Sequence, residues 1–304
     1  MSGRDIIHIF KGLLPDKRLL IDADMSRLTT FRIGGPADIV AEAESAEEIV
    51  ALLNAAKGTG VPFMVLGNGS NVLVKDKGVR GLVIRVNSAM SSIEAEGNLV
   101  RAQAGVTMSA LAKFLAEHSL AGFEFASGIP GSLGGALFMN AGSRDAWIGG
   151  IVCSVTSYVP GVGLKLRRHD DIEWGYRKSS LPAGEVILEA SLRLVTADAA
   201  LMRSQMESSR IRRQAHQPLG LPSCGSVFKN PEGASVGKLI ESCGLKGTTC
   251  GGAQVSEKHA NFIVNTGSAT ALDVLKLIHQ VRDCVKEEHG IELKPEVRFL
   301  GFPQ

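Results

Sequence analysis

The chain has 304 residues, of which 44% are hydrophobic, and this apolar content can fill the cores of two or three domains. Its formal charge of +2 at pH 7 and the absence of a basic run interleaved with aromatic residues make nucleic acid a poor candidate partner. Neither the opening sequence MSGRDIIHIFKGLLPDK nor any later stretch has the apolar length of a signal peptide or a membrane span, so we expect a cytoplasmic protein without a membrane partner.

The first half of the chain alternates strand and helix patterns. Residues 1–28 are polar with short helical stretches, as in a lid or arm. Residues 38–66 predict a β-α-β unit, in which two apolar strand patterns flank a helix that a capping box at Ser45 starts and Gly58 ends. Such a unit delivers the next turn to a strand end, where α/β folds commonly bind ligands. Strands at 82–86 and 99–104 and a helix from Thr107 are expected to follow.

The second half of the chain begins with strand patterns and ends with helices. Apolar alternation predicts a hairpin of strands 151–158 and 163–166 and a further strand over 185–195. Residues 197–216 are rich in helix formers and end before a proline, which is typical of a connector between domains. The last third is expected to contain a helix over 236–243, a strand over 259–265, a helix from Thr270 to Gly290, and a final strand whose Glu296 and Arg298 face away from its apolar side chains.

Two glycine-rich stretches are the strongest motif of the sequence. The first, 67–71, reads Gly-Asn-Gly-Ser-Asn and follows an apolar run, and the second, 126–142, reads ASGIPGSLGGALFMNAG without a charged residue. Glycines so spaced let the backbone turn tightly and let an extended ligand lie against bare N–H groups, which bind anions such as a diphosphate. One such stretch alone is most simply explained as a tight turn, whereas the pair predicts a nucleotide site.

Two rival phosphate motifs are excluded residue by residue. Residues 233–239 resemble a P-loop, but too few residues separate the glycines and Leu239 stands where a magnesium-binding hydroxyl is required, so we expect only the start of a helix. Residues 67–69 open like a dinucleotide fingerprint, yet Val72 occupies the position of the third glycine and no helical pattern follows at once. The sequence therefore argues against a standard Rossmann domain.

Three polar side chains have contexts suited to catalysis. Arg177 lies in the run 176–180, Tyr-Arg-Lys-Ser-Ser, where its planar guanidinium could hold an acidic substrate or a developing enolate, or the run could be a solvated loop. Ser226 lies beside a glycine and could donate a proton or simply form a turn. Glu296 follows Pro295, whose fixed φ would aim the carboxylate, although an ordinary solvent-facing carboxylate fits equally well. The residues alone indicate a nucleotide-using enzyme and leave redox chemistry open.

Metal sites and disulfides are not expected. The five cysteines are odd in number and show neither a CxxC motif nor a paired metal spacing, so reduced thiols are the default. The seven histidines are scattered and include no HExxH motif, and we therefore predict no metal site.

Short phrases with distinctive residues are spread over nearly the whole chain. They lie at 29–35 (TTFRIGG), 66–73 (LGNGSNVL), 128–135 (GIPGSLGG), 140–142 (NAG), 176–179 (YRKS), 225–231 (GSVFKNP), 258–265 (KHANFIVN) and 295–297 (PEV). In this order they resemble the UDP-N-acetylenolpyruvoylglucosamine reductase family, the flavoproteins of bacterial peptidoglycan synthesis. Each phrase is short, and the ordered combination makes the resemblance specific.

The resemblance implies an α+β fold with a vanillyl-alcohol-oxidase-like (PCMH-type) FAD-binding region in two parts and a C-terminal α+β substrate-binding domain. The implied domains are residues 1–85 with the N-terminal arm, 86–205 and 206–304. FAD would be bound without a covalent bond, because His118, the histidine between the glycine stretches, lies in a predicted helix. The residues expected to bind FAD are Gly67, Asn68, Gly69, Ser70, Asn71, Ser127, Gly128, Ile129, Pro130, Gly131, Gly134, Gly135, Asn140, Ala141 and Gly142.

The resemblance also implies the reaction. Hydride would pass from NADPH to FAD and from flavin N5 to C3 of UDP-N-acetylglucosamine enolpyruvate, and a proton would reach C2 to give UDP-N-acetylmuramate. Ser226 is implied as the proton donor, with Arg177 and Glu296 stabilising or helping to protonate the intermediate. This small sugar nucleotide would contact Tyr176, Arg213, Lys229 and Asn230, and no obligate protein partner is evident. The phrase at 176–179 is similar to the shorter subtype of the family, which lacks an extra substrate-covering loop.

Two alternatives stay open from the sequence. One is another FAD-dependent oxidase of the same fold, although the phrases at 225–231 and 258–265 argue against it. The other is a non-catalytic regulator, in which the glycine stretches bind a nucleotide and no flavin chemistry follows.

Overall fold

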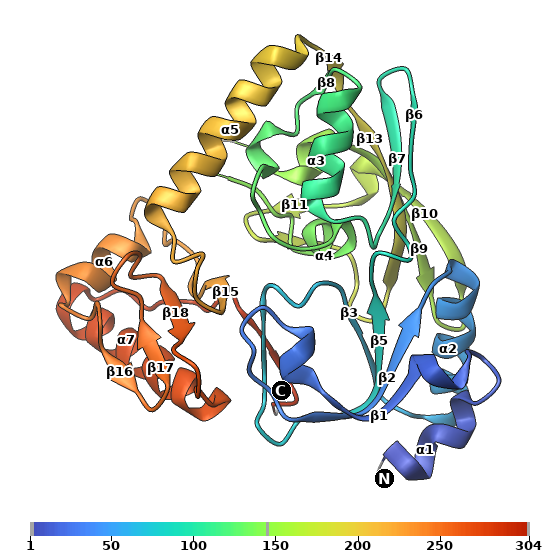
Figure 1. Cartoon of the computed structure of the whole chain (residues 1–304), viewed down its shortest axis with the longest axis horizontal. Coiled ribbons are helices and arrows are strands. Elements are labelled where there is room, and N and C mark those ends of the chain that lie inside the picture. Colours follow the sequence, from blue (N-terminus) through green and yellow to red (C-terminus); the bar gives the residue numbers. More distant parts are fainter. Residues whose placement is uncertain (1–2, 144–145, 303–304) are drawn as a thin grey trace. The chain divides into compact units, whose positions relative to one another are not determined.

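The computed structural model describes residues 3–143 and 146–302, and its chain divides into two compact units (Figure 1). The first unit comprises the described residues up to Ile21 together with 39–68 and 81–212. The second comprises 22–38, 69–80 and the described residues from Arg213 onward. The division into domains 1–85, 86–205 and 206–304 stays a prediction, and its outermost residues, 1–2 and 303–304, lie outside the described residues.

The first sheet is built around the predicted β-α-β unit. Its strand order is β1-β2-β5-β3, and β3 runs parallel to β5. Helix α2 (Ala46–Thr59) connects β2 to β3; its N-cap Ser45 hydroxyl accepts from the Glu48 N–H at 3.2 Å, and Gly60 ends it in place of the predicted Gly58. The strands are β1 (Leu19–Asp24), β2 (Pro36–Ala43), β3 (Phe63–Leu66) and β5 (Val79–Val86).

The N-terminal segment packs into the first core instead of forming a separate lid or arm. Helix α1 (Gly3–Phe10) contacts α2 and buries Ile6 and Phe10, and β1 is an outer strand of the first sheet. Two nitrogens of Arg18 donate to the Glu48 carboxylate at 2.6 and 2.8 Å, which joins the segment to α2. The segment looked polar because β1 exposes most of its side chains, and its pairing with β2 is not visible in local sequence.

The second sheet is antiparallel and has the order β10-β9-β13-β7-β6. The predicted hairpin is confirmed as β9 and β10, and the predicted helix from Thr107 is confirmed as α3. Both sheets, α3 and α4 bury their apolar side chains in one core. The bounds are β6 (Ile93–Glu96), β7 (Leu99–Gln103), α3 (Met108–Glu117), β8 (Leu120–Ala121), α4 (Leu133–Phe138), β9 (Val152–Val159), β10 (Gly163–Arg168), β11 (Trp174–Gly175), β12 (Lys178–Ser179), β13 (Val186–Arg193) and β14 (Val195–Thr196).

The second unit contains a four-stranded antiparallel sheet, in the order β15-β18-β17-β16, with two helices. The long helix begins at the predicted capping box, in which the Thr270 hydroxyl accepts from the Asp273 N–H at 3.1 Å, and it ends at Gly290, whose φ is 67°. The bounds are β15 (Ser223–Ser226), α6 (Val236–Ser242), β16 (Thr249–Cys250), β17 (Ala253–Val255), β18 (Phe262–Asn265) and α7 (Ala271–His289).

Two early segments of the chain complete the second unit. Strand β4 (Val72–Val74) pairs in parallel with β19 (Arg298–Leu300), and Phe31 and Leu73 are buried in the core of this unit. The Asp76 carboxylate accepts from the first N–H groups of α7, at 2.7 and 3.1 Å, and so stabilises the positive end of that helix. The final strand is shorter than predicted because its pairing starts only at Arg298, and Glu296 lies just before it.

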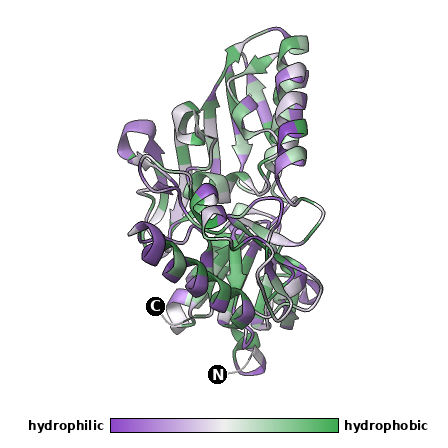
Figure 2. Ribbon diagram, turned by 90° about the vertical axis from the view of Figure 1, so that its left-hand side faces the viewer, coloured by the Kyte–Doolittle hydropathy of each residue, from purple (hydrophilic) through white to green (hydrophobic). Residues whose placement is uncertain are grey.

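Helix α5 (Ala199–His216) confirms the predicted helical connector, coloured gold in Figure 1. It buries only Met202, so most of its side chains face solvent. Figure 2 shows the general pattern, with hydrophobic residues frequent on the strands and both hydrophobic and hydrophilic residues along the helices. None of the helices in the described part of the chain combines the length and the apolar character that a bilayer crossing demands.

Candidate active site

The first glycine-rich stretch, 67–71, connects β3 to β4 and requires glycine at two positions. A Cβ atom on Gly67 would overlap the hydroxyl oxygen of Ser132. A Cβ atom on Gly69, whose φ is 62°, would overlap the carbonyl oxygen of Leu28. Since L side chains rarely adopt this φ, both space and backbone conformation select glycine.

The second glycine-rich stretch, 126–142, contains the helix α4, which the sequence did not predict. The stretch is anchored where the N–H groups of Leu133 and Gly134 donate to the carbonyls of Val106 and Ala104, at 2.8 and 2.9 Å. The close contact of Ser132 with Gly67, both in the first unit, places the start of the first stretch beside the second stretch.

Each stretch presents backbone N–H groups that have no acceptor within the described chain. Unpaired N–H groups of consecutive turn residues form concavities that bind anions, and neutral donors of this kind suit a diphosphate. No charged side chain belongs to either stretch. The donors are the N–H groups of Asn68, Gly69, Asn71, Gly128, Gly131 and Ser132.

The run 176–180 begins at the tip of a hairpin formed by β11 and β12, in the first unit. Arg177 has a φ of 54°, which a non-glycine residue adopts at a cost of about 1–3 kcal/mol and which is concentrated at functional sites. Its guanidinium carbon lies 5.2 Å from the centre of the Tyr176 ring, and Tyr176 is 52% exposed. The hairpin therefore presents a cation and an aromatic hydroxyl together.

Two hydrogen bonds fix this hairpin to the second glycine stretch. The Asn140 side chain donates to the Gly175 carbonyl at 2.9 Å, and the Ser179 hydroxyl donates to the Phe138 carbonyl at 3.0 Å. The Asn140 amide oxygen also accepts from the Gly149 N–H at 3.0 Å, and Asn140 is only 2% exposed. The Asn140 side chain thus joins the second glycine stretch to the hairpin and to Gly149. The position of Asn140 in the sequence motif did not predict this role.

Ser226 and Glu296 lie on adjacent segments of the second unit. The Glu296 N–H donates to the Val227 carbonyl at 2.7 Å, and the Lys229 N–H donates to the Lys294 carbonyl at 2.9 Å. The Ser226 hydroxyl makes no hydrogen bond within the described chain, so it is available to a ligand. The sequence suggested Ser226 and Glu296 as candidates independently of each other. In the fold, the hydrogen bond between Glu296 and Val227 brings the two segments together.

Asn71, the last residue of the first glycine stretch, is joined to the same place. Its side chain donates to the Glu296 carbonyl at 3.2 Å, and its own carbonyl accepts from the Arg298 N–H at 3.0 Å. The end of a predicted cofactor turn is therefore hydrogen-bonded directly to a predicted catalytic residue.

Cys224 lies close to Ser226 but does not offer a nucleophile. It is 2% exposed, and burial raises the pKa of its thiol to about 12. A thiolate is the reactive form of cysteine, so this side chain stays inert at neutral pH.

Two of the predicted substrate residues, Asn230 and Arg213, lie on different segments of the second unit. The Asn230 side chain accepts from the Val236 N–H at 3.0 Å and so helps to start α6. Arg213 lies near the end of α5 and is half-buried, with a buried Nε that has no hydrogen bond and no ion pair in the described chain. Burial lowers the pKa of Arg213, and an arginine held in this way is a candidate to receive an anion.

The phrase 258–265 supplies contacts that sequence reasoning did not assign. Lys258 Nζ donates to the Gln214 carbonyl at 2.6 Å, near the end of α5. His259 Nδ1 accepts from the Asn261 N–H at 3.2 Å, and burial lowers the pKa of the imidazole, so it is neutral at pH 7. The family resemblance of residues 258–265 drew attention to this segment in the sequence. The contacts of Lys258 and His259 could be assigned only from the folded structure.

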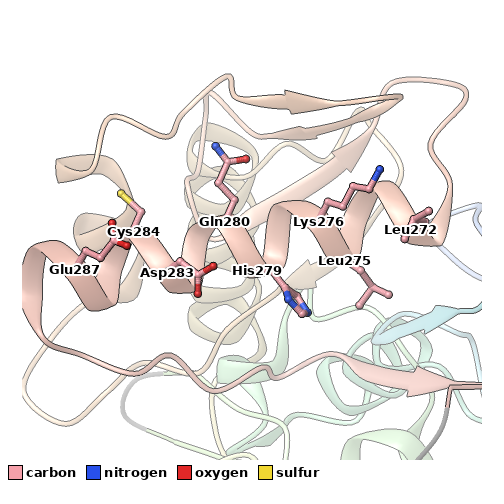
Figure 3. Close-up of a pocket in the computed structure, with 8 residues that line it drawn as sticks. All are labelled: Leu272, Leu275, Lys276, His279, Gln280, Asp283, Cys284 and Glu287. Atoms are coloured by element: carbon pink, nitrogen blue, oxygen red, sulfur yellow. The ribbon is translucent and has the colours of Figure 1, made fainter.

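An open hollow follows one side of α7 and contains none of the predicted site residues (Figure 3). Its side chains mix leucine with charged and polar groups and come from this one helix. They are Leu272, Leu275, Lys276, His279, Gln280, Asp283, Cys284 and Glu287. Within the described residues, no group of three or more His, Cys, Asp or Glu side chains could hold a metal ion.

Comparison with known proteins points to one family. Residues 217–300 match the model of the UDP-N-acetylenolpyruvoylglucosamine reductase C-terminal domain, and residues 37–160 match that of an FAD-binding domain. A protein of Clostridium perfringens, named UDP-N-acetylenolpyruvoylglucosamine reductase, is 43% identical over 287 residues, which is 94% of each chain. A protein of the same name from Clostridium beijerinckii is 42% identical over 295 residues, 97% of each chain.

Solved structures agree with the sequence comparison. The crystal structure of UDP-N-acetylenolpyruvylglucosamine reductase from Thermus caldophilus matches with a TM-score of 0.80 and 34% identity, over 93% of this chain and 98% of that one. Alkyldihydroxyacetonephosphate synthase matches with a TM-score of 0.50 and 18% identity over 63% of this chain, a likeness of fold alone. The predicted α+β fold with a vanillyl-alcohol-oxidase-like FAD-binding region is confirmed.

Proposed function

The chain belongs to the UDP-N-acetylenolpyruvoylglucosamine reductase family, and from this premise we propose how its own residues hold the cofactor, bind the substrate and move the proton. It is an FAD-dependent oxidoreductase that reduces UDP-N-acetylglucosamine enolpyruvate in peptidoglycan precursor synthesis. The near-complete coverage by relatives of this name sets aside the oxidase and regulator alternatives. NADPH as the reductant and a cytoplasmic location stay predictions, and the sugar nucleotide is the only partner that the proposal requires.

The single observation that carries the cofactor proposal is that both glycine stretches contain N–H groups without an acceptor among the described residues. These donors would receive the FAD diphosphate, with the chain supplying no counter-charge from either stretch. Bound FAD supplies a carrier that takes a hydride from NADPH and gives one to the substrate. Non-covalent binding is supported by His118, whose ring stacks on Phe114 at 4.0 Å and whose Nδ1 lies 2.8 Å from the Phe114 carbonyl oxygen.

The substrate proposal assigns anion-binding tasks to two arginines. The planar guanidinium of Arg177 suits bidentate binding of the substrate carboxylate or of the enolate that develops during the reaction. Tyr176 beside it offers an aromatic hydroxyl. Arg213 would receive the substrate diphosphate, because its charge is half-buried without an ion pair in the described chain. Lys229 and Asn230 follow Ser226 closely and would contact the sugar nucleotide.

The proton proposal gives C2 a proton from the Ser226 hydroxyl. A serine hydroxyl is a weak acid, so it donates only to a strongly basic carbon or as part of a relay. Glu296 would support that relay, since its backbone is hydrogen-bonded next to Ser226.

Ser226→Ala tests this role in separated half-reactions. NADPH should still bleach the flavin absorbance, whereas reoxidation by the enolpyruvyl substrate should slow by about 100- to 10,000-fold, the usual worth of a general acid. Ser223→Ala is the matched control, because it removes a hydroxyl from the same strand and should reoxidise close to the wild-type rate. Reoxidation of Ser226→Ala at the wild-type rate would show that another group gives the proton.

A further inference from the structure

Asn261 is a buried side chain outside the predicted site that holds the backbone directly after Ser226. It is 4% exposed and precedes β18. Its Oδ1 accepts from the Phe228 N–H at 2.9 Å, and its Nδ2 donates to the Phe228 carbonyl at 2.8 Å. Its own carbonyl accepts from the Val227 N–H at 2.8 Å. One residue therefore fixes two consecutive residues of the segment 226–230.

The segment needs such a partner because regular strand pairing fails there. Strands β15 and β18 pair at Ser223 with Val264 and at Ser226 with Phe262, so the β15 side contains one residue more between the two pairs. Gly225, inside this bulge, has a φ of 79°. A bulge re-aims a side chain and interrupts the ladder, which leaves later backbone groups without their usual partners. At Phe228 the Asn261 amide supplies the donor and the acceptor that a strand would have supplied.

The opposite side of the segment is bound to the chain that carries Glu296. The Val227 carbonyl accepts from the Glu296 N–H, and the Lys229 N–H donates to the Lys294 carbonyl. Residues 227–229 thus lie between Asn261 on one side and 294–296 on the other. Any shift allowed by loss of the Asn261 amide would move Ser226 relative to Glu296.

We propose that Asn261 is a positioning residue for proton transfer: its amide fixes the bulged segment so that the Ser226 hydroxyl is held in register with Glu296. This inference rests on the proposed roles of Ser226 and Glu296. It adds a residue that touches neither substrate nor cofactor and acts only through the backbone of Val227 and Phe228.

Asn265 provides a matched control. It is 5% exposed, is the last residue of β18, the strand that Asn261 precedes, and uses its amide similarly, donating to the Phe31 and Arg32 carbonyls and accepting from the Gly267 and Ala269 N–H groups. Asn261→Ala and Asn265→Ala therefore remove the same amide from sites of equal burial. Asn261→Asp keeps an acceptor for the Phe228 N–H and replaces the donor to its carbonyl with a buried oxygen that repels that carbonyl.

The experiment compares these variants of the FAD-loaded enzyme in three readouts. For Asn261→Ala we expect faster amide hydrogen exchange at 227–229, flavin bleaching by NADPH close to wild type, and about 100-fold slower reoxidation by the substrate. Asn261→Asp should also slow reoxidation, because its second oxygen repels the Phe228 carbonyl. Misplacement of the proton donor should also yield product with mixed configuration at C2, which thermal destabilisation alone would not cause.

Three results would overturn the inference: equal reoxidation rates in Asn261→Ala and Asn265→Ala, unchanged exchange at 227–229, or a single C2 configuration with full reoxidation in both Asn261 variants. The proposed function fails in a different way, because the wild-type protein itself would then not be reoxidised by the substrate.

Discussion

Two half-buried arginines have opposite electrostatic surroundings. Arg167 donates two hydrogen bonds to the Glu185 carboxylate, at 2.6 and 2.7 Å, and this carboxylate also accepts from the Ser157 hydroxyl. Arg213 has no ion pair in the described chain. A half-buried cation without a partner costs stability, so we expect Arg167 to serve the fold and Arg213 to serve a ligand.

Glu185→Gln tests the structural pair through its pH dependence. Burial raises the pKa of Glu185, but the hydrogen bonds from Arg167 and Ser157 outweigh burial and hold the pKa below its ordinary value of 4.5. Because the unfolded chain then takes up the proton first, the wild-type free energy of unfolding should fall as the pH drops from 4.5 through the lowered pKa. At pH 7 the variant should lose about 2–3 kcal/mol in urea unfolding, and it should lack this part of the acid sensitivity. Glu189→Gln, on the strand β13 that follows Glu185, is the control, and an equal loss there would contradict the assignment.

Arg213→Met tests the ligand role. Methionine keeps much of the buried stem and removes the charge, so KM for the sugar nucleotide should rise by about 10- to 100-fold with kcat little changed. The neighbouring Arg212 is exposed on the same helix, and Arg212→Met should leave KM near the wild-type value in the same steady-state assay. If both variants raise KM equally, the effect is one of overall charge and not of a site at Arg213.

Among the elements, those with local signals were predicted well. The capping residues Ser45, Thr107 and Thr270 mark the starts of α2, α3 and α7, because a cap satisfies N–H groups within its own turn. Helix α4 was missed because two of its six residues are glycines, which have low helix propensity, and its first N–H groups are satisfied by distant carbonyls. Strand β1 was missed because its pairing with β2 is equally non-local.

The contact between Gly67 and Ser132, where the first glycine stretch meets the second, can be tested by substitution. Gly67→Ala would place a methyl group on the Ser132 hydroxyl, so the turn must shift and FAD affinity should fall at least about tenfold, roughly 1.4 kcal/mol. Flavin absorbance or fluorescence titration of the apoprotein with FAD measures this loss.

Two further variants make that result specific. Gly58→Ala introduces the same methyl group in α2, where no atom lies within 4 Å, and it should leave FAD binding unchanged. Ser132→Gly combined with Gly67→Ala clears the overlapping atoms and should recover much of the affinity. A double variant that binds FAD no better than Gly67→Ala would contradict the stated cause.

For the whole molecule, the sequence singled out candidate site residues but did not predict the contacts that they make. The glycine stretches, Arg177, Ser226 and Glu296 belong to short phrases, which are visible locally. The hydrogen bond from the Asn71 side chain to the Glu296 carbonyl joins residues far apart in the chain. The hydrogen bonds between Asn261 and Phe228 depend on a bulge in β15. Such contacts are created by the packing of distant segments, so no local sequence pattern predicts them.

The most direct test of the whole account is one anaerobic absorption experiment on the purified protein. The account predicts flavin bands that bleach on addition of NADPH and return on addition of UDP-N-acetylglucosamine enolpyruvate without oxygen. Bleached bands that return only with oxygen would contradict reduction of this substrate. No flavin bands after reconstitution with FAD would contradict the assignment of the two glycine stretches as the FAD site.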